Sequence, residues 1–242
     1  MGGLSALSVL FVFLSYAVTT LFIVGFLAKI FKYATTPAPL KIPTTPAPTS
    51  RGGVAARLLG ELLLFTSLFR GNKWTWIGGY LFHFALALVL LRHLRYFLVP
   101  VPELVSFATE VGIWAGVLLP ITAIYLFLRR VLVDRLKYIS TGADYFVLIL
   151  IGLIAITGLV MKFSFRADIT SVKEFMVSLI SLSPVNIPMD PVFILHLTLV
   201  LVLMAYFPFS KLIHMGGVFF SPSRNQVDNS RDVRHVNPWA KR

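Results

Sequence analysis

Five long apolar runs, which hold few charged residues, decide what this chain can fold into. A bilayer core of about 30 Å needs about 20 apolar residues in a helix, and the runs come close to that length or exceed it. They extend roughly from Leu4 to Leu27, Trp76 to Leu98, Val111 to Leu128, Tyr145 to Met161 and Val192 to Phe209. The sequence therefore predicts an all-α fold, an integral membrane bundle of five transmembrane helices.

Composition supports a membrane protein and limits the chemistry that the chain can hold. The 242 residues are 57% hydrophobic and only 13% charged, far from the average of soluble domains. The first run is longer than a signal-peptide core and has no positive residue before it, so we expect a retained anchor. The chain contains no cysteine, which excludes disulfides, thiolate-bound iron–sulfur clusters and covalently attached haem.

The distribution of Lys and Arg predicts the orientation of the bundle. With an outer N-terminus, seventeen of the 22 Lys and Arg residues and five of the ten Asp and Glu residues lie on the cytoplasmic side. The net charge of +12 then lies wholly on that side, as the positive-inside rule expects. We therefore expect an outer N-terminus and a cytoplasmic C-terminus in the cytoplasmic (inner) membrane. The basic excess requires no nucleic acid as a partner.

We predict a transmembrane domain over residues 1–215 and a basic cytoplasmic tail over residues 216–242. Residues 33–53 contain the sequence TTPAP twice and form a Pro/Thr-rich linker, because such a composition does not pack as a regular element. Residues 54–70 are apolar but include Arg57 and Glu61, so we expect one helix that lies in the interface and contacts lipid.

Four of the five histidines fall within or at the end of just two apolar runs, and they are His83, His93, His196 and His214. Ionisable residues in membrane helices are costly and usually functional. His83 and His93 are ten residues apart, about 15 Å along a helix. His196 and His214 are eighteen apart, about 27 Å, and share one stripe if the helix stays regular past Pro208. We expect His235, in the tail, to be solvated.

The second and fifth runs cross in opposite directions, so the start of one lies level with the end of the other. This predicts that His83 meets His214 near the cytoplasmic face and that His93 meets His196 near the outer face. Two imidazoles at each of two levels are what two haems with axial histidines require. Two alternatives remain. Four unrelated hydrogen bonds between helices would use the same residues, and a metal transporter would need histidines and carboxylates that converge on one site.

The segment LFHFALALVLLRHLRYFLVP, with nine residues between its histidines, and the spacing of seventeen residues between His196 and His214 resemble the gamma subunit family of respiratory nitrate reductase. The tail HMGGVFFSPSRNQVDNSRDVRHVNPW is similar to the related M subunit of the Dsr complex, the membrane complex associated with dissimilatory sulfite reductase. The resemblance implies a cytochrome b subunit with two haem b groups. His83 and His214 would hold the cytoplasmic-side haem, and His93 and His196 the outer-side haem.

The resemblance also implies partners and a function. These partners are a membrane quinone such as menaquinol, a cytoplasmic iron–sulfur subunit related to heterodisulfide reductase, and other subunits of a membrane complex. The expected function is transmembrane electron transfer in dissimilatory sulfur metabolism, and the subunit alone is not a complete enzyme. The alternative is a non-redox membrane anchor for a cytoplasmic complex. The nitrate reductase relative uses a lysine near its outer haem, but no lysine lies between Lys73 and Lys137 here, so that quinone contact is not carried over.

Four charged residues lie near the expected level of His93. Arg92 and Arg95 flank it and are candidates to bind haem propionates, or alternatively reach the lipid headgroups. Glu103 and Glu110 are the nearest carboxylates and are candidates for quinone binding and proton handling, with ordinary loop solvation as the alternative.

Overall fold

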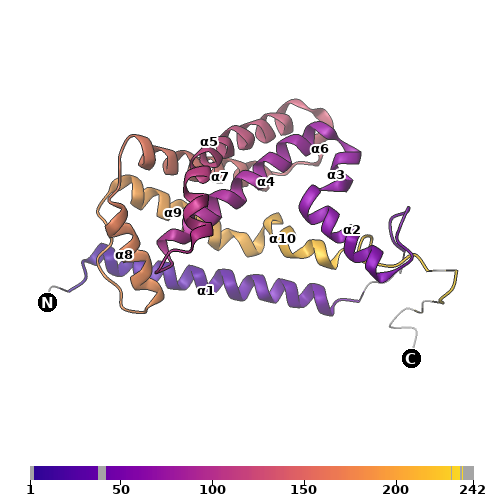
Figure 1. Ribbon diagram of the computed structural model, residues 1–242, viewed down its shortest axis with the longest axis horizontal. Coiled ribbons are helices and arrows are strands. Elements are labelled where there is room, and N and C mark those ends of the chain that lie inside the picture. The colour runs from indigo at the N-terminus through magenta and orange to yellow at the C-terminus, as the bar shows by residue number, and fades with distance from the viewer. Residues whose placement is uncertain (1–2, 38–41, 230, 235, 237–242) are drawn as a thin grey trace. The chain divides into compact units, whose positions relative to one another are not determined.

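The computed structural model describes residues 3–37, 42–229, 231–234 and 236, and all regular structure in these residues is helical (Figure 1). Five helices are long and apolar enough to cross a membrane, and each overlaps one of the predicted runs. They are Ala6–Thr35, Lys73–Tyr96, Glu103–Leu132, Gly142–Phe163 and Pro191–Phe209. The all-α prediction with five membrane helices is confirmed, and the chain is a multi-pass membrane protein.

The chain divides into two compact units, one formed by Met1–Leu21 with Ile77–Tyr206 and the other by Phe22–Trp76 with Phe207–Arg242. The first unit contains the start of α1 and most of α4, followed by η1, α5, α6, α7, α8 and α9. Their bounds are α1 (Ala6–Thr35), α4 (Lys73–His93), η1 (Leu94–Tyr96), α5 (Glu103–Leu132), α6 (Asp134–Ile139), α7 (Gly142–Phe163), α8 (Ile169–Ile180) and α9 (Pro191–Tyr206).

Small residues let the membrane helices of the first unit pack closely. α5 packs along α7, and α7 packs along α9. Buried Phe82 and Ala85 of α4 meet Ala115 and Leu119 of α5, together with Ile151 of α7. Small residues let two backbones approach, as between α5 and α7, which is how helices associate in a bilayer. α4, α5 and α7 therefore lie side by side (Figure 1).

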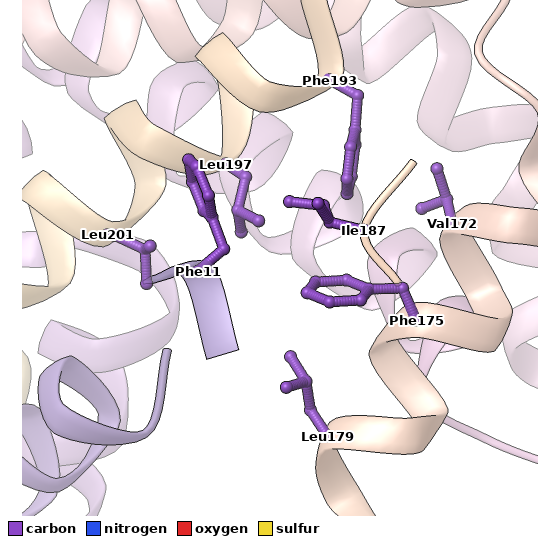
Figure 2. Close-up of a cluster of buried hydrophobic side chains, with 8 residues drawn as sticks. All are labelled: Phe11, Val172, Phe175, Leu179, Ile187, Phe193, Leu197 and Leu201. Atoms are coloured by element: carbon purple, nitrogen blue, oxygen red, sulfur yellow. The ribbon is translucent and has the colours of Figure 1, made fainter. Parts of the chain in front are cut away.

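The short amphipathic helix α8 is anchored by a second apolar cluster (Figure 2). Phe175 of α8 is fully buried among residues of α1, α9 and the loop between α8 and α9. Asp168 caps α8 by accepting hydrogen bonds from the backbone N–H groups of Thr170 and Ser171. The hydrogen bond from the Ser171 hydroxyl is the main reason why the pKa of Asp168 is lowered. α8 also contacts η1, so it lies against the end of α4.

The second unit contains α2 (Arg51–Leu64) and α3 (Thr66–Gly71) where one interfacial helix was predicted. Phe65 separates the two helices with a left-handed backbone conformation, φ 51°. Glu61 stabilises this corner, because its carboxylate accepts hydrogen bonds from the Thr66 hydroxyl and from the backbone N–H and hydroxyl of Ser67. Leu59, Leu62, Leu63 and Leu64 of α2 are exposed. Their position in the membrane interface stays a prediction.

The end of the fifth span is not a regular helix. α9 stops at Tyr206 and is followed by the 3-10 turns η2 (Phe207–Phe209) and η3 (Lys211–Ile213), the short helix α10 (His214–Gly217) and η4 (Val218–Phe220). Pro208 in η2 lacks an N–H group, and its ring would clash with the preceding turn if the α-helix continued. The condition for His196 and His214 to share one stripe, a helix that stays regular past Pro208, is therefore not met.

Candidate functional site

The first unit brings together two histidines that are far apart in the sequence. His93 is the last residue of α4, and His196 lies in the second turn of α9. The centroids of their rings are 6.3 Å apart, and the ring planes differ by 12°. Both side chains are half-buried. The predicted proximity of His93 and His196 is thus found as a nearly parallel pair of imidazoles.

Both imidazoles are held through the same ring nitrogen. His93 Nδ1 lies 2.6 Å from the carbonyl oxygen of Val89. Because a carbonyl oxygen only accepts, Nδ1–H donates, and the lone pair of the neutral ring is on Nε2. His196 Nδ1 lies 2.9 Å from the Thr157 hydroxyl of α7. This arrangement is typical of metal-binding histidines, whose second nitrogen is oriented by another group.

The pair fits the two axial ligands of a haem iron. A metal–imidazole bond is about 2 Å long and the ring centroid lies about 1 Å further on, so two rings on one iron have centroids about 6 Å apart. The observed 6.3 Å agrees with this distance. Among the described residues, no group of three or more His, Cys, Asp and Glu side chains gathers around a metal-sized site. Two imidazoles suffice where a porphyrin provides the other four ligands.

Aromatic and cationic side chains surround His93. The Tyr96 ring lies edge-on to His93 at a centroid distance of 5.8 Å, and the Arg95 guanidinium lies 5.8 Å from the Tyr96 centroid. Nε of Arg92 is buried and has no hydrogen-bond partner in the described part of the chain. The Arg92 side chain crosses α5 at Gly112. These positions keep both arginines as candidates to bind an anionic group near His93.

The structure places Glu103 and Glu110 on the surface of α5. Glu103 is the first residue of that helix, and both side chains are exposed. In the described ranges neither carboxylate forms an ion pair or a hydrogen bond with the histidine pair. Their part in proton handling therefore stays a prediction.

The second predicted pair spans the two units. His83 Nδ1 lies 2.7 Å from the Gly79 carbonyl oxygen, and His214 Nδ1 lies 2.8 Å from the Lys211 carbonyl oxygen. Both rings therefore have the same tautomer as His93. His214 also lines a pocket of about 380 Å³ in the second unit, together with Tyr33, Lys211, Ile213, Gly217 and Phe220. The pairing of His83 with His214 stays a prediction, and His235 lies outside the described residues.

Three residues at the site were not predicted from the sequence. Thr157 bonds to His196, Gly158 lies against the same ring, and Gly112 lies under Arg92. Each is a small residue in an apolar helix, and such residues usually serve helix packing. Only the positions of the neighbouring helices distinguish these three residues from other small residues that serve packing alone.

These features define a cytochrome b-like membrane protein, whose spanning helices present paired imidazoles. The chain belongs to the nitrate reductase gamma subunit family, whose sequence profile matches residues 65–227. It is similar to two archaeal proteins, each called "Hdr-like menaquinol oxidoreductase cytochrome b-like subunit". It is 36% identical to that of Archaeoglobus fulgidus, with 94% of this chain and 82% of the relative covered. It is 31% identical to that of Archaeoglobus profundus, with 95% and 82% covered. The family implies haem as the cofactor.

Proposed function

We propose that this chain is the electron-transfer subunit of a membrane complex that oxidises quinol and passes the electrons to a cytoplasmic iron–sulfur partner. The observation that carries the proposal is the His93–His196 pair, whose centroid distance of 6.3 Å fits two axial ligands of one haem iron. The names of the two archaeal relatives support a quinol, and menaquinol in particular, as the electron donor.

Two haem b groups complete the proposal, with His93 and His196 at the outer side and His83 and His214 at the cytoplasmic side. Haem supplies reversible one-electron transfer when it is bound. The protein contributes the four imidazoles, each oriented through Nδ1 by a carbonyl or hydroxyl oxygen. Fixed imidazoles lower the cost of binding and set the basicity of the ligand.

The charged residues near His93 take two different roles in this proposal. Arg92 and Arg95 have no carboxylate partner among the described residues, so they are suited to the haem propionates. Glu103 and Glu110 are exposed at the same end of α5 and accept the protons that quinol oxidation releases.

The cytoplasmic partner is proposed to be an iron–sulfur subunit related to heterodisulfide reductase, within a complex of dissimilatory sulfur metabolism. The term "Hdr-like" in the names of the relatives supports this partner. The basic segments suited to bind it are the region from Arg129 to Lys137 and the tail from residue 216 on. Both lie on the cytoplasmic side in the predicted orientation.

The test is a haem count in purified protein and in single histidine variants. We expect a b-type spectrum after reduction and two haems per chain by the pyridine haemochrome method. Replacing any one of His83, His93, His196 and His214 by Ala should lower the count to one or less. His235→Ala is the matched control and should retain two haems. A menaquinol analogue should reduce the wild-type haem in membranes.

Two results would overturn the proposal. A colourless pure protein would instead indicate a non-redox anchor of a cytoplasmic complex. A full haem count in any of the four single variants would mean that the ligand pairs are assigned wrongly.

A further inference from the structure

We propose that Thr157 and Gly158 of α7 form the surface against which the His196 imidazole packs. Thr157 acts as a positioning residue that sets the orientation and basicity of this ligand. The inference rests on the proposed haem ligation by His196. It concerns a helix that contributes no histidine to the site.

The first observation is the contact between Thr157 and His196. The Thr157 Oγ1 atom lies 2.9 Å from His196 Nδ1 and also 2.9 Å from the carbonyl oxygens of Leu153 and Ile154. A threonine hydroxyl has one proton, and a carbonyl oxygen can only accept it. The proposal assigns this proton to a carbonyl oxygen of the same helix, so that the hydroxyl accepts from His196 Nδ1–H. This leaves the lone pair of the ring on Nε2, the nitrogen that would bind the haem iron.

The second observation is the space next to Thr157. A Cβ atom at Gly158 would lie 3.4 Å from His196 Cε1, at the near limit of ordinary van der Waals contact. Cε1 is the ring carbon between the two nitrogens, so a side chain at position 158 would touch the ring edge next to Nε2. Consecutive residues of α7 thus bond one ring nitrogen and leave room for the adjacent carbon.

The contrast with the other histidines shows what Thr157 does. His83, His93 and His214 are each held by a backbone carbonyl three or four residues earlier in the sequence. Only His196, among these four, is held by a side chain of a different helix. A backbone carbonyl cannot be removed by mutation, but a side-chain hydroxyl can. The basicity of His196 can therefore be changed by one substitution, at Thr157. Acceptor strength at Nδ1 tunes ligand basicity and hence the potential of the metal.

The experiment compares three variants in the purified, haem-loaded protein. Thr157→Val removes the acceptor but keeps the shape, Thr157→Ser keeps the hydroxyl, and Thr198→Val is the matched control. Thr198 is exposed on α9, and its hydroxyl bonds only to the Ile194 carbonyl of its own helix. The readouts are the midpoint potential of each haem and the low-spin ferric electron paramagnetic resonance signal, which depends on the relative orientation of the two imidazole planes.

We expect Thr157→Val to raise the potential of one haem, because a less basic ligand stabilises the ferric state less. The resonance signal of the same haem should shift or broaden. If Thr157→Val loses that haem altogether while the Ser and Thr198 variants keep it, the hydroxyl is needed to hold the ligand, and the inference stands. Gly158→Ala should perturb the same signal.

The inference is overturned if Thr157→Val has the wild-type potential and signal, or if Thr157→Ser changes them as much as Thr157→Val does. The His196→Ala variant separates this failure from that of the proposed function. If His196→Ala keeps both haems, the ligand assignment itself is wrong. If it loses one haem and Thr157→Val changes nothing, only the role of Thr157 is wrong.

Discussion

The side chain of Arg92 crosses α5 at Gly112, where a Cβ atom would come within 2.8 Å of Arg92 Cδ and 2.9 Å of Arg92 Cβ. Because the contact includes the start of the side chain and not only its flexible end, Arg92 must move if Gly112 gains a methyl group. We expect Gly112→Ala to destabilise the protein by about 1–3 kcal/mol, the typical cost of overpacking. Thermal unfolding in detergent measures this change.

Gly116→Ala is the matched control, one turn further along α5. A Cβ atom there would meet only the end of Leu159, at an ordinary distance of 3.7 Å. If the two alanine variants unfold at the same temperature, the contact between Arg92 and Gly112 does not constrain the protein.

Removal of the Arg92 charge should change the potential of the haem proposed at His93 without removing that haem. Positive charge near a haem favours the reduced state, which carries one negative charge more. We therefore expect Arg92→Gln to lower the midpoint potential of one haem while the haem count stays the same. A spectroscopic redox titration measures the potential. Arg166→Gln, at an exposed position outside the predicted spans, should have no effect. An equal shift in both variants would indicate a long-range effect instead of a contact.

Glu61 should make the corner between α2 and α3 sensitive to acid. Burial raises the pKa of Glu61, but hydrogen bonds from Ser67 and Thr66 and the positive charge of Arg224 outweigh burial, so the pKa lies below its ordinary value of 4.5. A lowered pKa stabilises the fold fully above the pKa of the unfolded chain, and the contribution is lost as the pH falls through the pKa of the folded protein.

The wild type should therefore be more stable than Glu61→Gln near neutral pH, and the difference should shrink below about pH 4.5. Thermal unfolding of both proteins between pH 7 and pH 3 tests this expectation. A difference that stays constant over the whole range would show that the charge of Glu61 does not matter.

The absence of cysteine allows the predicted orientation to be mapped without background labelling. We expect a single cysteine at Arg166 to react with a membrane-impermeant maleimide added to whole cells, and one at Lys137 to react only after the cells are opened. On the exposed face of α2, a cysteine at Leu63 should be protected by lipid if that helix lies in the interface. Reversed labelling at Arg166 and Lys137 would reverse the orientation of the bundle.

The membrane helices could be predicted because the bilayer sets the length of an apolar run. The same argument singled out the histidines, since an ionisable residue in such a run is costly. His93 and His196 could be paired because antiparallel spans bring the start of one level with the end of the other.

The remaining details depend on tertiary contacts that leave no local pattern. Thr157 bonds to its own backbone as any threonine in a helix does, and only the position of α9 makes it a partner of His196. No glycine or proline marks the break between α2 and α3 at Phe65. The break is stabilised by hydrogen bonds from residues of α3 to the Glu61 side chain, which no local sequence pattern indicates. For Pro208 the disturbance of the helix was expected, but the extent of the irregular stretch after it was not.

The interrupted backbone between α9 and α10 has a consequence for how the two proposed haem sites can diverge. An unbroken helix would transmit rotation about its axis from one histidine to the other. Two 3-10 turns stand between His196 and His214, so the orientation of each ring depends on its own support: Thr157 for one, the Lys211 carbonyl for the other. We therefore expect a change in one support to leave the other ring in place. If both proposed haems are present, selection can adjust their redox potentials one at a time, and so set the driving force for electron transfer between quinol and the partner.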